Sequence, residues 1–190
     1  MTTRGRFTRL VSVLITVALL AAVGCSTVPK AEDRGTFLRE AGAATHWFER
    51  NVYGLRSQMN SSAAYIVFPS VGQWGIIFTG GKFGRGTLNR PDGTQIGWAA
   101  VNTGSLGLQA GVQGFKMLVV LEDDATLSAF MENRLTGGVS GIVVVGEGGG
   151  SAQAPFENGV AIYQGANTGL MAGVNVGLDY MRHKPLGDDS

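Results

Sequence analysis

Two segments in which every second residue is apolar constrain the fold of this chain most. In SLGLQAGVQ, 105–113, and GLMAGVNVG, 169–177, the apolar positions face one way and mostly glycine or polar residues face the other. This period of two is typical of a β-strand with one buried face. Glycines along one face permit close backbone approach or sharp curvature. We therefore expect a curved, mostly antiparallel, glycine-rich sheet that is partly barrel-like.

The other strand patterns surround this pair and place the chain in the α+β class as a single domain. Pro91-Asp92-Gly93 has the composition of a tight turn between two strands, because proline presets φ and glycine accepts a positive φ. KMLVVL, 116–121, is an apolar run that fits a central strand covered on both faces. Further strands are expected at Ala63–Pro69, Trp74–Thr79, 141–146 and 159–165, with a turn at ENG, 157–159.

A long N-terminal helix is predicted by apolar residues spaced three and four apart. Gly54 lies within the run, so a break is expected near it. Arg39, His46 and Arg50 fall on the opposite side, which fits either a cationic face that touches a membrane or the solvated face of a packed helix. A short helix is expected over 124–134, with Asp123 as its N-cap. The apolar stripe of the long helix comprises Phe37, Ala41, Ala44, Phe48, Val52, Leu55 and Met59.

The N-terminus has the features of a secretory signal, residues 1–24. Three arginines precede an apolar run, Leu10–Val23, which is shorter than the roughly 20 residues that span a membrane. LLAAVGC resembles the bacterial lipoprotein lipobox, which implies cleavage before Cys25 and its acylation, for example with palmitate. By the same resemblance, Ser26 indicates a periplasm-facing outer-membrane anchor. The predicted organisation is an acylated tether 25–35, a domain 36–184 and a frayed tail 185–190.

Charge and motif content narrow the function classes. Without the arginines of the signal, 12 basic residues oppose 14 acidic ones, which argues against a nucleic-acid partner. The chain has two histidines and one cysteine, no HExxH, no G-x-S-x-G and no calcium-loop motif. We therefore expect a non-enzyme without a cofactor or metal site.

Basic residues gather in one glycine-rich stretch, GIIFTGGKFGRGTLNR, 75–90. It lacks the order of a Walker loop or a dinucleotide fingerprint. Gly80–Gly86 is therefore interpreted as a β-turn. With Lys82, Arg85 and Arg90 it could hold a phosphate group, although an ordinary solvated turn explains the same residues.

These segments together resemble the SYLF domain, also called the Ysc84 domain, over residues 37–181. The resemblance rests on Phe68-Pro69, the Gly80–Gly86 glycines, the strand 107–113 and GLMAGV, 169–174. It implies a lipid-binding module whose membrane-facing parts correspond here to Arg39 and Arg50 on the helix and to Lys82 and Arg85.

Three functions follow from this resemblance and from the residues. The first is an envelope lipoprotein that binds anionic lipids such as phosphatidylglycerol or cardiolipin through Arg39, Arg50, Lys82, Arg85 and Arg90. The second is a structural lipoprotein whose partner is another envelope protein. The third is a carrier that encloses an acyl chain in its curved sheet.

Overall fold

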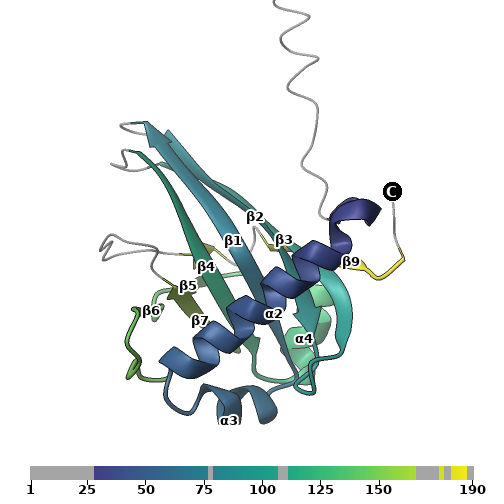
Figure 1. Cartoon of the computed structure of the whole chain (residues 1–190), viewed down its shortest axis with the longest axis vertical. Coiled ribbons are helices and arrows are strands. Elements are labelled where there is room, and N and C mark those ends of the chain that lie inside the picture. The colour runs from purple at the N-terminus through teal and green to yellow at the C-terminus, as the bar shows by residue number, and fades with distance from the viewer. Residues whose placement is uncertain (1–27, 77–78, 107–110, 166–175, 178–180, 188–190) are drawn as a thin grey trace, which may run out of the picture.

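A computed structural model describes residues 28–76, 79–106, 111–165, 176–177 and 181–187 (Figure 1). The signal, Cys25 and most of the segment 169–177 lie outside them. The helical elements are η1 (Ala31–Asp33), α2 (Arg34–Asn51), α3 (Leu55–Asn60) and α4 (Asp124–Met131). The strands are β1 (Ala64–Ile76), β2 (Thr79–Asn89), β3 (Gln95–Leu106), β4 (Gly111–Leu121), β5 (Gly138–Val139), β6 (Val143–Val145), β7 (Val160–Gly165), β8 (Val176–Gly177) and β9 (Met181–Pro185).

The main sheet has seven strands in the order β6-β7-β4-β1-β2-β3-β9. All its neighbours pair antiparallel except β6 and β7, which are parallel. The predicted α+β class with a mostly antiparallel sheet is therefore confirmed. In the described part of the chain β6 and β9 form opposite edges, so this sheet is open and does not have the barrel-like closure that the glycines suggested.

Helices cover both faces of the sheet. In Figure 1, α2 crosses the front of the sheet diagonally, and α4 lies behind it. Strand alternation divides the core accordingly, because Tyr65 and Val67 pack with Phe48 of α2, whereas Ile66 and Phe68 pack with α4. Residues 117–121 of β4 are all buried, which confirms the predicted central strand. None of the described helices is long and apolar enough to cross a bilayer.

The helix predictions are confirmed with small changes at the ends. The stripe from Ala41 to Met59 is buried, and the break occurs at Gly54, which has φ 74° and separates α2 from α3. Asp123 caps α4 by accepting a hydrogen bond from the Thr126 amide at 2.8 Å. Helical structure begins at Ala31, inside the predicted tether.

Three strand predictions are wrong. The two strands expected on either side of Pro69 are one 13-residue strand, β1. Its pairing register shifts between Val67 and Ser70, so a bulge accommodates a proline that cannot donate a ladder hydrogen bond. The segment 105–113 is not one strand either, because its first residues end β3 and its last residues begin β4.

The third error concerns Gly80–Gly86, which lies inside β2 and is not a turn. Pairing with β1 on one side and β3 on the other supplies ladder hydrogen bonds that outweigh the weak strand preference of glycine. Among these glycines and their strand partners, the requirement for glycine is clear at Gly72 of β1, because of its packing. A Cβ placed there would lie 2.5 Å from the Phe83 ring, so glycine lets this ring lie against the sheet.

Candidate functional site

The five cations predicted from sequence do not form one cluster. Lys82 and Arg85 lie in β2, whereas Arg90 lies five residues beyond Arg85, at the turn that carries Pro91-Asp92-Gly93. At about 3.3 Å per strand residue, Lys82 and Arg90 are separated by roughly 25 Å of backbone. The side chain of Lys82 lies outside the described atoms. The cluster expected in one basic turn is therefore absent, because the stretch is extended.

Arg39 and Arg50 are exposed on α2, as predicted. The Arg39 guanidinium donates a hydrogen bond to Thr36 Oγ1 at 3.1 Å. Arg50 lies in the last turn of the helix, eleven residues further on. This spacing corresponds to about 16 Å along the helix axis, so the two arginines act as separate surface charges. Their proposed role in lipid binding stays a prediction.

A hollow of about 340 Å³ lies between α2 and the sheet, next to Arg85. We call it the Phe37 hollow, because Phe37 is its only residue from the helix. Phe83 in its wall is 50% exposed, so an aromatic ring is open to solvent beside a guanidinium. The other residues that line it come from β1, β2 and β3 and are Ser70, Gly72, Gly84, Arg85, Ala100, Val101 and Asn102.

Strand register places two further cations beside this hollow. Arg85 pairs with Ala100 of β3, and Ala100 pairs with Arg182 of β9. Met181 packs in the core with α4, and the His183 ring makes an edge-to-face contact with Phe130 of α4. Arg182 and Lys184 therefore project from the opposite face, which is the face of α2. Two strand spacings of about 4.8 Å separate the Arg85 and Arg182 backbones.

Arg34 completes the group from the helix side. Its guanidinium carbon lies 5.9 Å from the centroid of the Trp98 ring, and Trp98 pairs with Lys184 in the neighbouring strand. The Phe37 ring lies 6.1 Å from the same Trp98 ring. Arg34 also donates from Nε to the Pro29 carbonyl at 3.3 Å, which fixes its side chain at the start of the helix. We call Arg34, Arg85, Arg182 and Lys184 the cationic cluster.

The sheet beneath the cationic cluster carries no negative side chains. The sequences of β4, β1, β2, β3 and β9 contain no Asp or Glu. A carboxylate can therefore reach this region only from a helix or a loop, for example from Glu40 of α2. Arginine side chains offer planar, bidentate hydrogen-bond donors that suit phosphate oxygens. Next to the half-exposed Phe83 ring, this arrangement suits a ligand with an anionic and an apolar part.

Sequence reasoning missed three of the four members of the cationic cluster. Arg182 and Lys184 lie at the end of the predicted domain 36–184, and they escaped because no strand was predicted there, whereas MRHKP forms β9. The alternation of buried and exposed residues in MRHKP is the signal that could have revealed the strand. Arg34 was assigned to the tether. In the described part of the chain, no group of His, Cys, Asp and Glu could hold a metal ion.

Comparison with known protein families gives a match to the C-terminal part of the chain. Residues 102–184 match the family model Ysc84, described as Las17-binding protein actin regulator. No curated protein matches the chain. The matched segment runs from β3 to Lys184 of β9, so it contains Arg182 and Lys184, two of the three cations that sequence reasoning missed. The match agrees with the family resemblance drawn from sequence patterns.

Proposed function

We propose that this chain, whose residues 102–184 match the Ysc84 family model, binds anionic membrane lipids through the cationic cluster and catalyses no reaction. The observation that carries the proposal is the row Arg85–Ala100–Arg182, which brings two guanidinium groups to one face of the sheet beside the Phe37 hollow. Phosphate head groups would accept hydrogen bonds from these arginines. Phe83 would lie against the acyl region, because its ring is half exposed.

The proposed lipid anchor at Cys25 is consistent with a domain whose cationic cluster faces the membrane. Cys25 precedes Arg34 by nine residues, a chain that reaches at most about 30 Å when extended. Arg34 belongs to the cationic cluster, so an acyl group on Cys25 would hold this cluster close to a bilayer. We therefore propose a lipoprotein of the bacterial envelope, facing the periplasm, in which the anchor brings the domain to the membrane and the cluster selects anionic lipid.

Vesicle co-sedimentation of the Cys25→Ser chain tests this proposal without the anchor. We expect binding to phosphatidylglycerol vesicles, weak binding to phosphatidylcholine vesicles, and loss of binding as salt screens the charges. A basic residue near an anionic surface contributes about 1 kcal/mol. The double variant Arg85→Ala/Arg182→Ala should therefore bind about 30-fold more weakly.

A matched control removes the same charge elsewhere. Arg90 lies at the start of the β2–β3 turn, five residues beyond Arg85, and Arg134 is paired with Glu132 beyond α4. The double variant Arg90→Ala/Arg134→Ala should bind nearly as well as the parent chain. Equal losses in the two double variants would show that total charge, and not the cationic cluster, drives binding.

A protein partner is the alternative function, and the description of the matched family favours it, since it names a binding protein and an actin regulator. In that case the unanchored chain would bind anionic and neutral vesicles equally or neither of them. The same co-sedimentation series therefore separates the two functions.

A further inference from the structure

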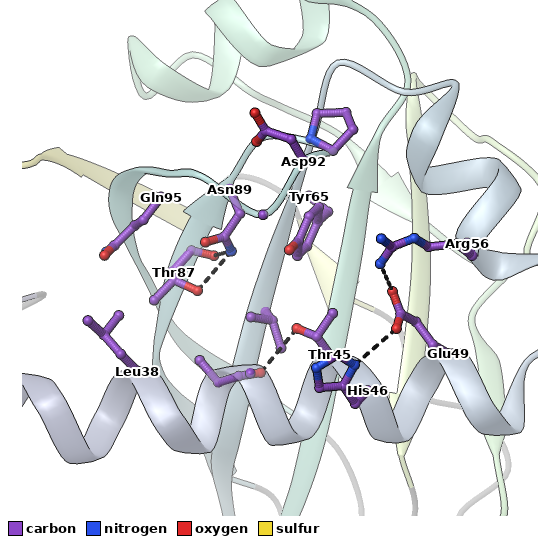
Figure 2. Close-up of a pocket in the computed structure, with 15 residues that line it drawn as sticks. Leu38, Thr45, His46, Glu49, Arg56, Tyr65, Thr87, Asn89, Asp92 and Gln95 are labelled. Carbon is purple, nitrogen blue, oxygen red and sulfur yellow. Dashed lines mark hydrogen bonds and ion pairs between the residues drawn. The ribbon is translucent and has the colours of Figure 1, made fainter.

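A second hollow lies on the other flank of α2 (Figure 2). Along β1, Tyr65 and Val67 line this second hollow, whereas Ser70 and Gly72 line the Phe37 hollow. It has a volume of about 480 Å³ and lies between α2 and the turn at Pro91-Asp92-Gly93. We call it the polar hollow.

The floor of the polar hollow is made of neutral polar side chains. Tyr65, Thr87 and Asn89 are at most 7% exposed and point into the space between helix and turn in Figure 2. Asn89 donates from Nδ2 to Thr87 Oγ1 at 2.9 Å, which orients its amide and leaves the Oδ1 acceptor toward other partners. No group in the described part of the chain hydrogen-bonds the Tyr65 hydroxyl.

Tyr65 keeps its proton under ordinary conditions. Burial, and after it the negative charge of Glu49, raises the pKa of the Tyr65 phenol. The hydroxyl is therefore a neutral donor and acceptor at the floor of the hollow. Gln95 adds an amide whose Nε2 donates to the Gly97 carbonyl at 3.1 Å, so its Oε1 is left as an acceptor.

The charged residues of the rim already have partners. Glu49 accepts from Arg56 at 2.6 Å and is bonded to His46 Nδ1 at 3.2 Å, as the dashed lines in Figure 2 mark. Asp92 accepts from the Thr94 amide at 2.8 Å. With two carboxylates against one guanidinium, the rim disfavours an anion. An ammonium ligand would have to compete with the existing partners of both carboxylates.

From these contacts we propose that the polar hollow binds a neutral, hydroxyl-rich small molecule of the size of a mono- or disaccharide. The volume falls within the range of small-molecule sites, about 300–1,000 Å³. Sugar hydroxyls can donate to Asn89 and Gln95 and pair with the Tyr65 hydroxyl. Leu38 and Val67 supply apolar walls for the C–H face of such a ligand. This inference is independent of the proposed lipid binding.

The test is an NMR titration of the ¹⁵N-labelled Cys25→Ser chain with glucose, N-acetylglucosamine and maltose. We expect saturable shifts of the Tyr65, Thr87 and Asn89 amides with at least one of these sugars. Tyr65→Phe removes only the hydroxyl and should weaken binding about two- to tenfold, the effect of one hydrogen bond. Tyr53→Phe is the matched control, because Tyr53 is 86% exposed and does not line the hollow.

A blocking variant keeps the test decisive if the phenol contributes little. Gly42 lines the polar hollow, and a Cβ placed there has no neighbour within 4 Å. Gly42→Leu should therefore fill the hollow without disturbing the core and abolish the shifts. Three results would each overturn the proposal: no saturable shift with any of the three sugars, shifts that Gly42→Leu leaves unchanged, or saturable shifts with glucose 6-phosphate but with no neutral sugar.

Discussion

The two hollows beside α2 differ in charge although they share one helix and one face of one sheet. The Phe37 hollow borders Arg85 and lies next to β9, which contributes Arg182 and Lys184. The polar hollow borders the β2–β3 turn. Its charged lining residues are Asp92 from this turn, Glu49 from α2 and Arg56 from α3, together with His46 if it is protonated. The comparison teaches that the register of an edge strand determines the charge of a surface. Five residues of β9 place two cations next to one hollow, whereas the other hollow lies away from β9 and has a floor of neutral polar side chains.

The largest effect is expected from loosening the packing of α2, the helix that contributes residues to both hollows. Phe48 of α2 is completely buried between the helix and the sheet. Phe48→Ala should lower the free energy of unfolding by about 3–5 kcal/mol, and both lipid and sugar binding should weaken together. Guanidinium unfolding monitored by circular dichroism measures the loss.

Tyr53→Ala is the control for this prediction, because the side chain is 86% exposed and its loss should change the unfolding free energy by less than about 0.5 kcal/mol. A loss below about 1 kcal/mol for Phe48→Ala would contradict close packing of α2 on the sheet.

The next prediction compares the contribution to lipid binding of the cationic cluster with that of the helix arginines, Arg39 and Arg50, which the family resemblance implies. Lys184→Ala should weaken binding to phosphatidylglycerol vesicles about fivefold, the effect of about 1 kcal/mol. Arg50→Ala should leave binding nearly unchanged, since Arg50 lies 16 residues, roughly 24 Å along the axis, from Arg34. Co-sedimentation at low salt measures both. The reverse order of effects would assign lipid binding to the exposed face of α2.

A stabilising change is expected on the side of the polar hollow. Gly42 lies in α2 with open space around it, so Gly42→Ala should raise the unfolding free energy by about 0.5–1 kcal/mol through helix preference. Gly97→Ala is the contrasting variant, because a Cβ there would lie 2.5 Å from His183 Nε2. It should destabilise the chain. Thermal unfolding of both variants checks the prediction, and equal behaviour would contradict the described packing.

The smallest effect concerns the dependence of stability on pH, which is absent at neutral pH and appears only on acidification. Burial lowers the pKa of the His183 imidazole below its usual value of about 6.5, and no hydrogen-bond partner for its buried Nε2 is found among the described residues. The unfolded chain therefore takes up a proton that the folded chain resists, so stability is complete above pH 6.5 and declines as the pH falls below it.

Melting temperatures at several pH values below neutrality test this prediction against His183→Gln, which cannot take up the proton. The variant should lose less stability on acidification than the parent chain. Parallel curves would show that other groups control the acid response.

Much of the fold could be predicted because its signals are local. The α2 stripe, the break at Gly54 and the Asp123 cap each depend on residues within a few positions. Pro69 was misinterpreted as a strand end because a bulge that depends on pairing with two neighbours accommodates it. Gly80–Gly86 was misinterpreted because glycine favours turns until strands on both sides pair with it.

The candidate site could be predicted less well, because it is made by long-range register. Arg85 was identified from sequence, but its neighbour Arg182 lies two strands away in space and close to the C-terminus in sequence. Composition revealed several cations and could not determine which of them share a face. The polar hollow had no sequence signal at all, since Tyr65, Thr87 and Asn89 fit ordinary strand patterns.

The most direct test of the central claim is to ask which face of the domain meets an anionic bilayer. Ser70 is exposed in the wall of the Phe37 hollow, and Ser128 is exposed on α4, across the sheet. In the Cys25→Ser chain, Ser70→Cys and Ser128→Cys each carry an environment-sensitive fluorophore. Our account predicts a blue shift at position 70 with phosphatidylglycerol vesicles, none with phosphatidylcholine vesicles, and none at position 128. A shift at position 128 alone, or equal shifts at both positions, would contradict it.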